Sequence, residues 1–160
     1  MLESVLLDTS FFLRFLNKND ILFGNADAYY KYFLEKEVAM VISSISIAEF
    51  CVRGTIEQLP LKNLQILPFN VNHAKRTGEF ARVLFEARQK GELEQTERLL
   101  ISNDAKLFGQ ADQELKIKYF VTSDARSLKP FNVLKSSIEL KFDIIDISQK
   151  HTETFGTLGL

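Results

Sequence analysis

Short runs of apolar residues, separated by longer amphipathic stretches, give this chain its hydrophobic pattern. The runs are almost continuous in apolar character and do not alternate with polar residues. Strands that are covered on both faces, as in a parallel sheet, have this composition. The pattern therefore predicts buried strands at residues 4–7, 38–42, 119–122 and 142–147, with a weaker strand at 64–67.

Helical periodicity fills the intervals between these runs. The longest helical stretch is 72–90, in which Thr77, Ala81 and Leu84 recur at three- and four-residue spacing and Gly91 supplies a stop signal. Strands that alternate with helices predict an α/β sandwich built on a parallel sheet. The other predicted helices are 27–36, 46–53 and 103–115.

Length and composition predict a single domain. The chain has 160 residues, of which 46% are hydrophobic and 26% charged, the usual balance of a soluble globular domain. No linker, repeat or low-complexity tract divides it. We therefore expect one domain at 1–150, followed by a C-terminal tail at 151–160, "HTETFGTLGL", whose periodicity is weak.

Net charge and hydropathy argue against an overall basic nucleic-acid-binding surface, a secretory signal and a membrane span. The formal net charge is −1, so no overall basic field attracts nucleic acid, although a local basic patch is compatible with it. Glu3 and Asp8 occupy the N-terminal region where a secretory signal would carry Lys or Arg and an unbroken apolar core. No apolar run approaches the roughly 18 residues of a membrane span. We expect a cytoplasmic protein with no membrane partner.

Cysteine and histidine do not predict a metal centre. The single cysteine, Cys51, excludes an intrachain disulfide and a Cys-built zinc site, and its apolar surroundings predict a buried position. His73 and His151 have no partner at metal-binding spacing. We expect His73, at the start of the longest predicted helix, to lie on the surface.

Four carboxylates stand where one predicted element gives way to the next. Asp8 directly follows the first strand, in "VLLDTSFF", and Asp124 follows the strand in "KYFVT". Glu49 lies in the first turn of the helix after "VAMVISSI", and Asp104 opens the helix "NDAKLFGQAD". Ligands of open parallel sheets bind beyond the carboxyl ends of the strands. We therefore expect these acids to gather at that edge.

Such a group of carboxylates is suited to a hard divalent cation. Mg²⁺ and Mn²⁺ prefer carboxylate, water and phosphate oxygens as ligands. Without a cation, three or four acids held together would repel one another and resist ionisation. With one, the site lowers the pKa of a bound water and offsets the charge that develops on a phosphodiester during hydrolysis.

Small hydroxyl residues and one arginine complete the predicted site. Thr9, Thr122 and Ser123 flank Asp8 and Asp124 in sequence, so we expect them to contact substrate phosphate or ordered water. Arg126, two residues after Asp124, is the strongest candidate for a phosphate contact among the basic residues. Ser10 fits a helix-capping role better.

Helix capping is the alternative interpretation of each acid taken alone. Asp is a favoured N-cap residue, and Ser46 with Glu49 has the form of a capping box. Asn103 and Asp104 could likewise cap the following helix. Caps do not require acids, because Ser, Thr and Asn serve as well. Four acids at four boundaries together favour a functional site.

At these residues the sequence resembles the PIN-domain nucleases, most closely the small toxins of the VapC type. "VLLDTSFFLRFL" resembles the first strand, first acid and following helix of that family, and "VISSISIAEF" its second strand and glutamate-bearing helix. "ISNDAKLFGQA" resembles the helix that begins with the third acid, and "KYFVTSDARSL" the strand that ends in Thr-x-Asp. The segments keep the family's order from residue 5 to about residue 147.

The resemblance implies a fold, an activity and partners. The implied fold is a three-layer α/β/α sandwich with a central, mainly parallel sheet, and the implied activity is hydrolysis of RNA with Mg²⁺ or Mn²⁺. Asp8, Glu49, Asp104 and Asp124 would form the acidic site, with Asp8 and Asp104 most directly tied to the metal. A toxin of a type II toxin–antitoxin pair would form a homodimer and bind an antitoxin that covers the acid cleft.

Two other classes of function remain to be compared with this one. A non-catalytic scaffold of the same fold would keep an acid pocket that binds metal weakly. Phosphoryl transfer through an aspartyl phosphate would require Asp-x-Asp or paired acids after the first strand, whereas the chain has Asp8, Thr9 and Ser10 there. A phosphate-binding loop is not predicted either, since no glycine cluster precedes a helix.

Overall fold

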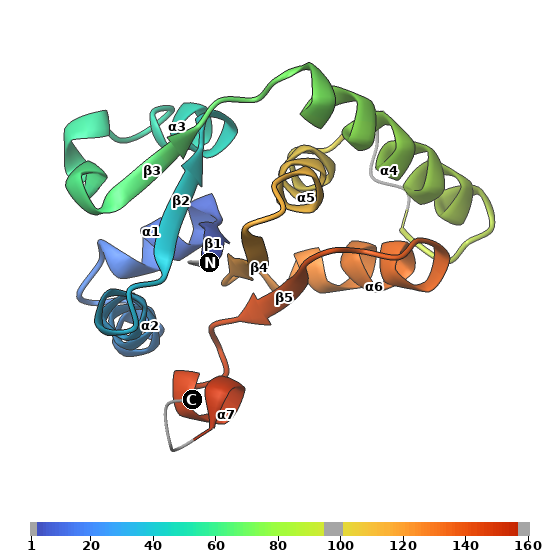
Figure 1. Ribbon diagram of the computed structural model, residues 1–160. Coiled ribbons are helices and arrows are strands. Elements are labelled where there is room, and N and C mark those ends of the chain that lie inside the picture. Colours follow the sequence, from blue (N-terminus) through green and yellow to red (C-terminus); the bar gives the residue numbers. More distant parts are fainter. Residues whose placement is uncertain (1–2, 95–100, 157–160) are drawn as a thin grey trace.

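The computed structural model describes residues 3–94 and 101–156, which form a central sheet with helices on both faces (Figure 1). All five strands of the sheet are parallel, in the order β3-β2-β1-β4-β5. The α/β sandwich with a parallel sheet is therefore confirmed. The strands are β1 (Ser4–Leu7), β2 (Ala39–Ser43), β3 (Leu64–Leu67), β4 (Ile117–Thr122) and β5 (Asp143–Asp146).

Helices connect the strands and cover the two faces of the sheet. α1 and α2 lie on one side, and α4, α5 and α6 lie on the other (Figure 1). Short 3-10 segments occupy Ile56–Gln58, Leu61–Asn63 and Ala125–Ser127. The helices are α1 (Thr9–Phe15), α2 (Phe23–Glu35), α3 (Ser44–Phe50), α4 (Val71–Gln89), α5 (Asn103–Gln113), α6 (Leu128–Ser137) and α7 (His151–Phe155).

Strand β1 shows why the apolar runs are continuous. Val5 and Leu7 pack into the cluster formed with α1 and α2, whereas Leu6 packs into the opposite cluster formed with α4, α5 and α6. All three side chains are buried. Because neighbouring residues of a strand point to opposite faces, a strand that is covered on both faces needs apolar residues at every position.

Predicted and observed boundaries agree more closely for the strands than for the helices. The strands predicted at 4–7 and 64–67 have the predicted bounds, and the other strands shift by one or two residues. α2 begins at Phe23, ahead of the prediction. α6 was not predicted, and it contains Pro130. This proline lies in the first turn of α6, where its missing N–H would have had no partner within the helix.

Two predictions about buried and exposed side chains are wrong. Cys51 is exposed, because it is the C-terminal cap of α3 and lies beyond the packed face of that helix. His73 is fully buried instead of lying on the surface. Its Nδ1 accepts a hydrogen bond from the backbone N–H of Asn70, and its Nε2 lies 2.8 Å from Oε1 of Glu114, so burial leaves neither ring nitrogen without a partner.

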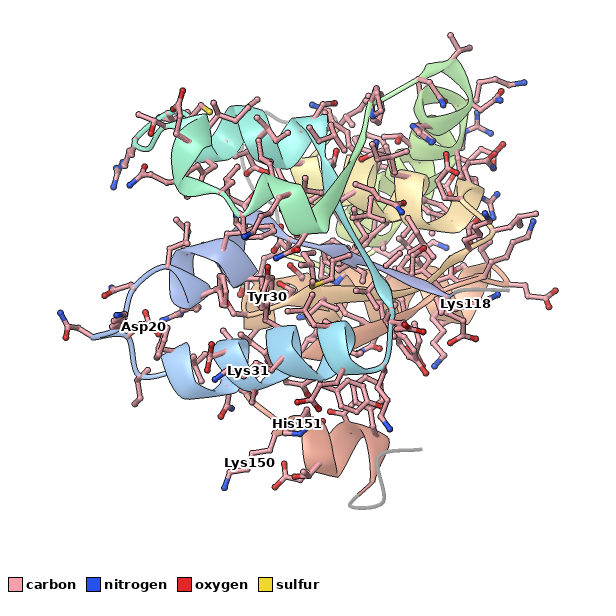
Figure 2. The ribbon with its side chains drawn as sticks, turned by 60° about the vertical axis from the view of Figure 1, so that its left-hand side comes forward. Asp20, Tyr30, Lys31, Lys118, Lys150 and His151 are labelled. Carbon is pink, nitrogen blue, oxygen red and sulfur yellow. The ribbon has the colours of Figure 1, made fainter. Side chains whose placement is uncertain are left out.

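The segment predicted as a C-terminal tail contains α7, which packs against α2. The Phe155 ring stacks on Tyr32 with 4.6 Å between the ring centroids. The Tyr29 hydroxyl lies 2.6 Å from Oγ1 of Thr154. Figure 2 shows His151, at the start of α7, below α2. Across the described residues, the structure contains no helix with the length and apolar character needed to cross a membrane.

Candidate active site

Asp8 is held rigidly at the junction between β1 and α1. The strand ends at Leu7 and the helix begins at Thr9, so Asp8 is the N-cap of α1 and its Oδ1 accepts the backbone N–H of Thr9 at 2.8 Å. Its Oδ2 accepts hydrogen bonds from Oγ of Ser10 at 2.8 Å and Oγ1 of Thr122 at 2.9 Å. The side chain is buried, and these three hydrogen bonds fix its orientation.

A network of hydroxyl groups joins the ends of β1 and β4. Ser10 accepts a hydrogen bond from the backbone N–H of Ser123 at 2.9 Å, and Ser123 Oγ donates to the carbonyl oxygen of Ser10 at 3.0 Å. Thr122 Oγ1 accepts the backbone N–H of Asp124 at 3.0 Å. Ser10 therefore supports Asp8 and β4 instead of capping a helix. Thr122 and Ser123, predicted to contact substrate, also serve the internal network.

Glu49 reaches the same place from the last turn of α3, and not from the first turn as predicted, because α3 begins at Ser44. Its Oε1 accepts a hydrogen bond from Oγ1 of Thr9 at 3.0 Å, which connects α3 to the start of α1. The N-cap of α3 is Ser43, whose side chain accepts the backbone N–H of Ile45, so the capping box predicted for Ser46 and Glu49 is wrong. The Glu49 carboxylate is directed to α1 and does not cap its own helix.

Asp104 lies in the first turn of α5 and is also not a cap. The N-cap is Ser102, which accepts the backbone N–H of Ala105 at 3.1 Å. Oδ2 of Asp104 instead accepts a hydrogen bond from Oγ of Ser127, at 3.2 Å. This hydroxyl belongs to the segment after β4 and was not anticipated from the sequence. The capping alternative is thus wrong for Asn103 and Asp104.

Asp124 differs from the other acids because it has a cationic partner. Its Oδ1 caps the 3-10 segment by accepting the backbone N–H of Arg126 at 3.0 Å. The Arg126 guanidinium also reaches both carboxylate oxygens, with Nε–Oδ1 and Nη2–Oδ2 distances of 3.0 Å. The Arg126 side chain is 91% exposed, so this bidentate pair lies at the surface of the site.

The pKa of Asp104 depends on the charges of the other three acids. Burial and the negative charges of Asp8, Asp124 and Glu49 together raise the pKa of Asp104 to about 6, against the lowering effect of the hydrogen bond from Ser127. Burial also raises the pKa of Asp8, opposed by its hydrogen bonds. The hydrogen bond from Arg126 is the main cause that lowers the pKa of Asp124.

The chemistry of this donor set suits a hard divalent cation. The groups at the site that could bind a cation are carboxylate and hydroxyl oxygens, and a cation would reduce the repulsion that, after burial, raises the pKa of Asp104. The acids are nevertheless not drawn together into a cage: within residues 3–94 and 101–156, no three His, Cys, Asp or Glu side chains are placed to hold a metal ion.

Arg14 is a further charged residue at this edge that was not anticipated from the sequence. Its Nε lies 3.4 Å from Oγ of Ser123, and its charge contributes to lowering the pKa of Asp124. The available signal was spacing, since Arg14 lies four residues after Ser10 and thus on the same face of α1. That signal says nothing of Ser123, which is far away in sequence.

Solved structures with the same fold are known. The chain is similar to the structure of VapBC2 from Rickettsia felis bound to a DNA fragment from their promoter, with a TM-score of 0.57, 22% identity and coverage of 89% of this chain and 97% of that chain. It is similar to DNA-bound VapBC from Salmonella typhimurium, with a TM-score of 0.56, 19% identity and coverage of 92% and 99%. No family model and no curated protein sequence matches the chain.

A third similar structure is Mycobacterium tuberculosis VapC20, a sarcin-ricin loop cleaving toxin. Its TM-score is 0.50 at 15% identity, and the match covers 78% of this chain and 93% of that chain. At these identities the similarity shows the fold. The chain therefore has the PIN-domain fold of VapC toxins, as the sequence motifs indicated.

Proposed function

We propose that the protein is a metal-dependent ribonuclease that hydrolyses RNA phosphodiester bonds. The observation that carries this proposal is the set of four carboxylates, from four separate segments, whose charges act on one another at the carboxyl edge of the sheet. The fold adds support, because one structure that shares it belongs to a toxin that cleaves the sarcin-ricin loop.

The four acids would have two different roles toward the cation. Asp8 and Asp104 would hold Mg²⁺ or Mn²⁺, while Glu49 and Asp124 would complete the set of ligands or orient the attacking water. When bound, the cation would make water a better nucleophile and offset charge on the phosphodiester. Ser10 and Thr122 hydrogen bonds keep Asp8 in one orientation.

The remaining polar residues would position the substrate and the acids. Thr9 orients Glu49, and Ser127 orients Asp104, through the hydrogen bonds described above. Thr9, Thr122 and Ser123 stay our candidates for contacts with the substrate. The exposed guanidinium of Arg126 would exchange one carboxylate contact for a phosphate oxygen when RNA binds.

We also propose that the protein is the toxin of a toxin–antitoxin pair and forms a homodimer. Two of the structures with the same fold are VapBC assemblies on DNA. An antitoxin bound over the acid edge would keep RNA away from the carboxylates. Co-expression with the product of a neighbouring reading frame, followed by co-purification and loss of cleavage, would test this partner.

The decisive experiment measures cleavage of a mixed single-stranded RNA with Mg²⁺, with Mn²⁺ and with EDTA. We expect cleavage with either metal, none with EDTA, and a loss of about 100-fold or more in Asp8→Asn, which removes a metal ligand. Asp143→Asn is the matched control, because this exposed acid lies at the start of β5, away from the carboxyl edge. Full cleavage by Asp8→Asn would contradict the assignment.

The second candidate function is a non-catalytic scaffold of the same fold. The observation in its favour is the ion pair in which Arg126 already satisfies both oxygens of Asp124. Calorimetric titration with Mg²⁺ and Mn²⁺ separates the two functions. Absence of both cation binding and RNA cleavage would favour the scaffold.

A further inference from the structure

Arg14 is held in place from two directions at the end of α1. Its Nη1 lies 3.1 and 2.9 Å from the two carboxylate oxygens of Asp20, and its Nε lies 3.4 Å from Oγ of Ser123. Asp20 is itself fixed, because its Oδ1 accepts the backbone N–H of Leu22 at 2.8 Å. Figure 2 shows Asp20 at the loop that leads from α1 to α2. The guanidinium therefore has a defined orientation before any ligand binds.

A short chain of contacts connects this guanidinium to the acids. Ser123 Oγ donates to the carbonyl oxygen of Ser10, and Ser10 Oγ donates to Asp8. Asp124 follows Ser123 directly, and the positive charge of Arg14 contributes to lowering its pKa. Arg14 thus lies at the edge of the acid site, on a different segment from Arg126.

Part of the guanidinium remains available for a ligand. Its Nη2 group makes no hydrogen bond to any residue in the described ranges, and the Arg14 side chain is 36% exposed. A salt bridge that served only to join α1 to the following loop would require neither the contact with Ser123 nor a position beside the acids. A planar, permanently charged guanidinium with a free amino group is suited to a phosphate oxygen.

We propose that Arg14 is a phosphate-positioning residue, whose Nη2 donates to a non-bridging phosphate oxygen of the RNA while Asp20 and Ser123 fix its orientation. This inference rests on the ribonuclease proposed above. Its physical role follows from charge: an acidic site on a protein of net charge −1 repels a polyanion, and a fixed cation at the edge of that site offsets the repulsion locally. RNA would then be held between residues from α1 and from the segment after β4.

The test is binding of a fluorescein-labelled single-stranded RNA in EDTA, measured by anisotropy at several salt concentrations. We expect Arg14→Gln to weaken binding by about tenfold, the size of one charge-assisted hydrogen bond. The slope of log affinity against log salt should fall by about 0.7, the value for one phosphate contact on a single strand. Arg14→Lys should keep most of the slope and recover only part of the affinity.

Lys118→Gln is the matched control for net charge. Lys118 lies near the start of β4, at the end of that strand opposite Thr122, and Figure 2 shows it far from Asp20. The Lys118→Gln variant should bind RNA with the affinity of the wild type. Calorimetric titration with Mn²⁺ should show no loss of affinity in Arg14→Gln, since Arg14 is not a metal ligand.

Three results would overturn the inference. The first is that Arg14→Gln binds RNA as tightly as Lys118→Gln does. The second is that Arg14→Gln loses affinity for both RNA and Mn²⁺. The third is that the slope of log RNA affinity against log salt is the same in Arg14→Gln as in the wild type. If Arg14→Gln does not fold, Arg14→Lys provides the test. An RNA affinity equal to that of the wild type in Arg14→Lys would then contradict the inference. A wild type that cleaves RNA while Arg14→Gln binds normally overturns this inference alone. A wild type that neither binds nor cleaves RNA overturns the proposed function with it.

Discussion

Two clusters of charged residues in this protein are organised in opposite ways. Between α4 and α5, the buried carboxylate of Asp112 accepts hydrogen bonds from Nε of Arg76 at 2.7 Å and from the backbone N–H of Lys141 at 2.8 Å. At the carboxyl edge of the sheet, Asp8 and Asp104 accept hydrogen bonds from hydroxyl groups, and no Lys or Arg within residues 3–94 and 101–156 forms an ion pair with either. Each cluster contains one buried acid, Asp112 in the first and Asp8 in the second.

The difference separates a structural cluster from the one that we propose to be functional. The α4–α5 cluster is complete, because the negative charge of Asp112 is paired with a positive charge in the folded protein. The acid edge is incomplete, since repulsion from Asp8, Asp124 and Glu49 helps to raise the pKa of Asp104 to about 6. An unneutralised group of acids reduces stability, which agrees with the cation site that we propose there.

Breaking the complete cluster should have the largest effect on stability. Arg76→Ala would leave the carboxylate of Asp112, which is 2% exposed, without its cation, and we expect a loss of about 3 kcal/mol in the free energy of unfolding. Urea titration measures this loss. Activity per folded molecule should stay unchanged. A loss no larger than that of Arg82→Ala, on the exposed side of α4, would show that the pair is not structural.

The acid edge should destabilise the protein as the pH rises. The folded pKa of Asp104, about 6, lies above the unfolded value of 3.8, so the folded state holds the proton more tightly and loses stability as pH rises from about 4 to about 6. We expect the contribution of Asp104 to this loss to be about 3 kcal/mol and Asp104→Asn to remove that contribution. Melting temperatures in EDTA between pH 4 and 7 test both statements.

The same stability measurement with an added divalent cation tests whether the acid edge binds that cation. Added Mg²⁺ or Mn²⁺ should restore stability to the wild type at pH 7, because it binds the folded state, and should do so less in Asp104→Asn. Equal pH profiles for the two proteins in EDTA would mean that Asp104 does not carry the repulsion.

The smallest effect concerns a polar group that belongs to neither cluster. Ser46 is fully buried in α3, and its Oγ has no hydrogen-bond partner within the described part of the chain. Ser46→Ala should therefore leave stability unchanged or raise it by up to about 1 kcal/mol. Thermal melting beside Ser43→Ala, which removes the N-cap of α3 and should destabilise the protein, checks this. A clear decrease for Ser46→Ala would indicate a bound water.

The acids could be located from the sequence because each stands beside a local signal. Asp8 and Asp124 follow buried strands, and such strands are recognised by their apolar composition. Parallel strands then bring their carboxyl ends to one edge without further information. The roles of Asp8, Glu49, Asp104 and Asp124 in catalysis remain predictions.

The partners of these acids could not be predicted, because they depend on tertiary contacts. Ser127 reaches Asp104 only after α5 and the segment following β4 have packed together. His73 resembles a surface residue in its local sequence, yet packing of α4 against α5 buries it. Cys51 lies in an apolar pattern but beyond the last packed turn of α3. The local hydropathy of the sequence does not predict which helices pack together, nor which side chains at the end of a helix remain exposed.

The hydrogen bond between Thr122 and Asp8 also determines when the site is completed during synthesis. The two residues are 114 positions apart, and Asp8 acquires this partner only when β4 has formed beside β1. A chain still being extended on the ribosome therefore exposes β1 and α1 long before its acids are in place. If the site cuts RNA as proposed, the nascent chain stays harmless to the ribosome that makes it until translation has passed β4.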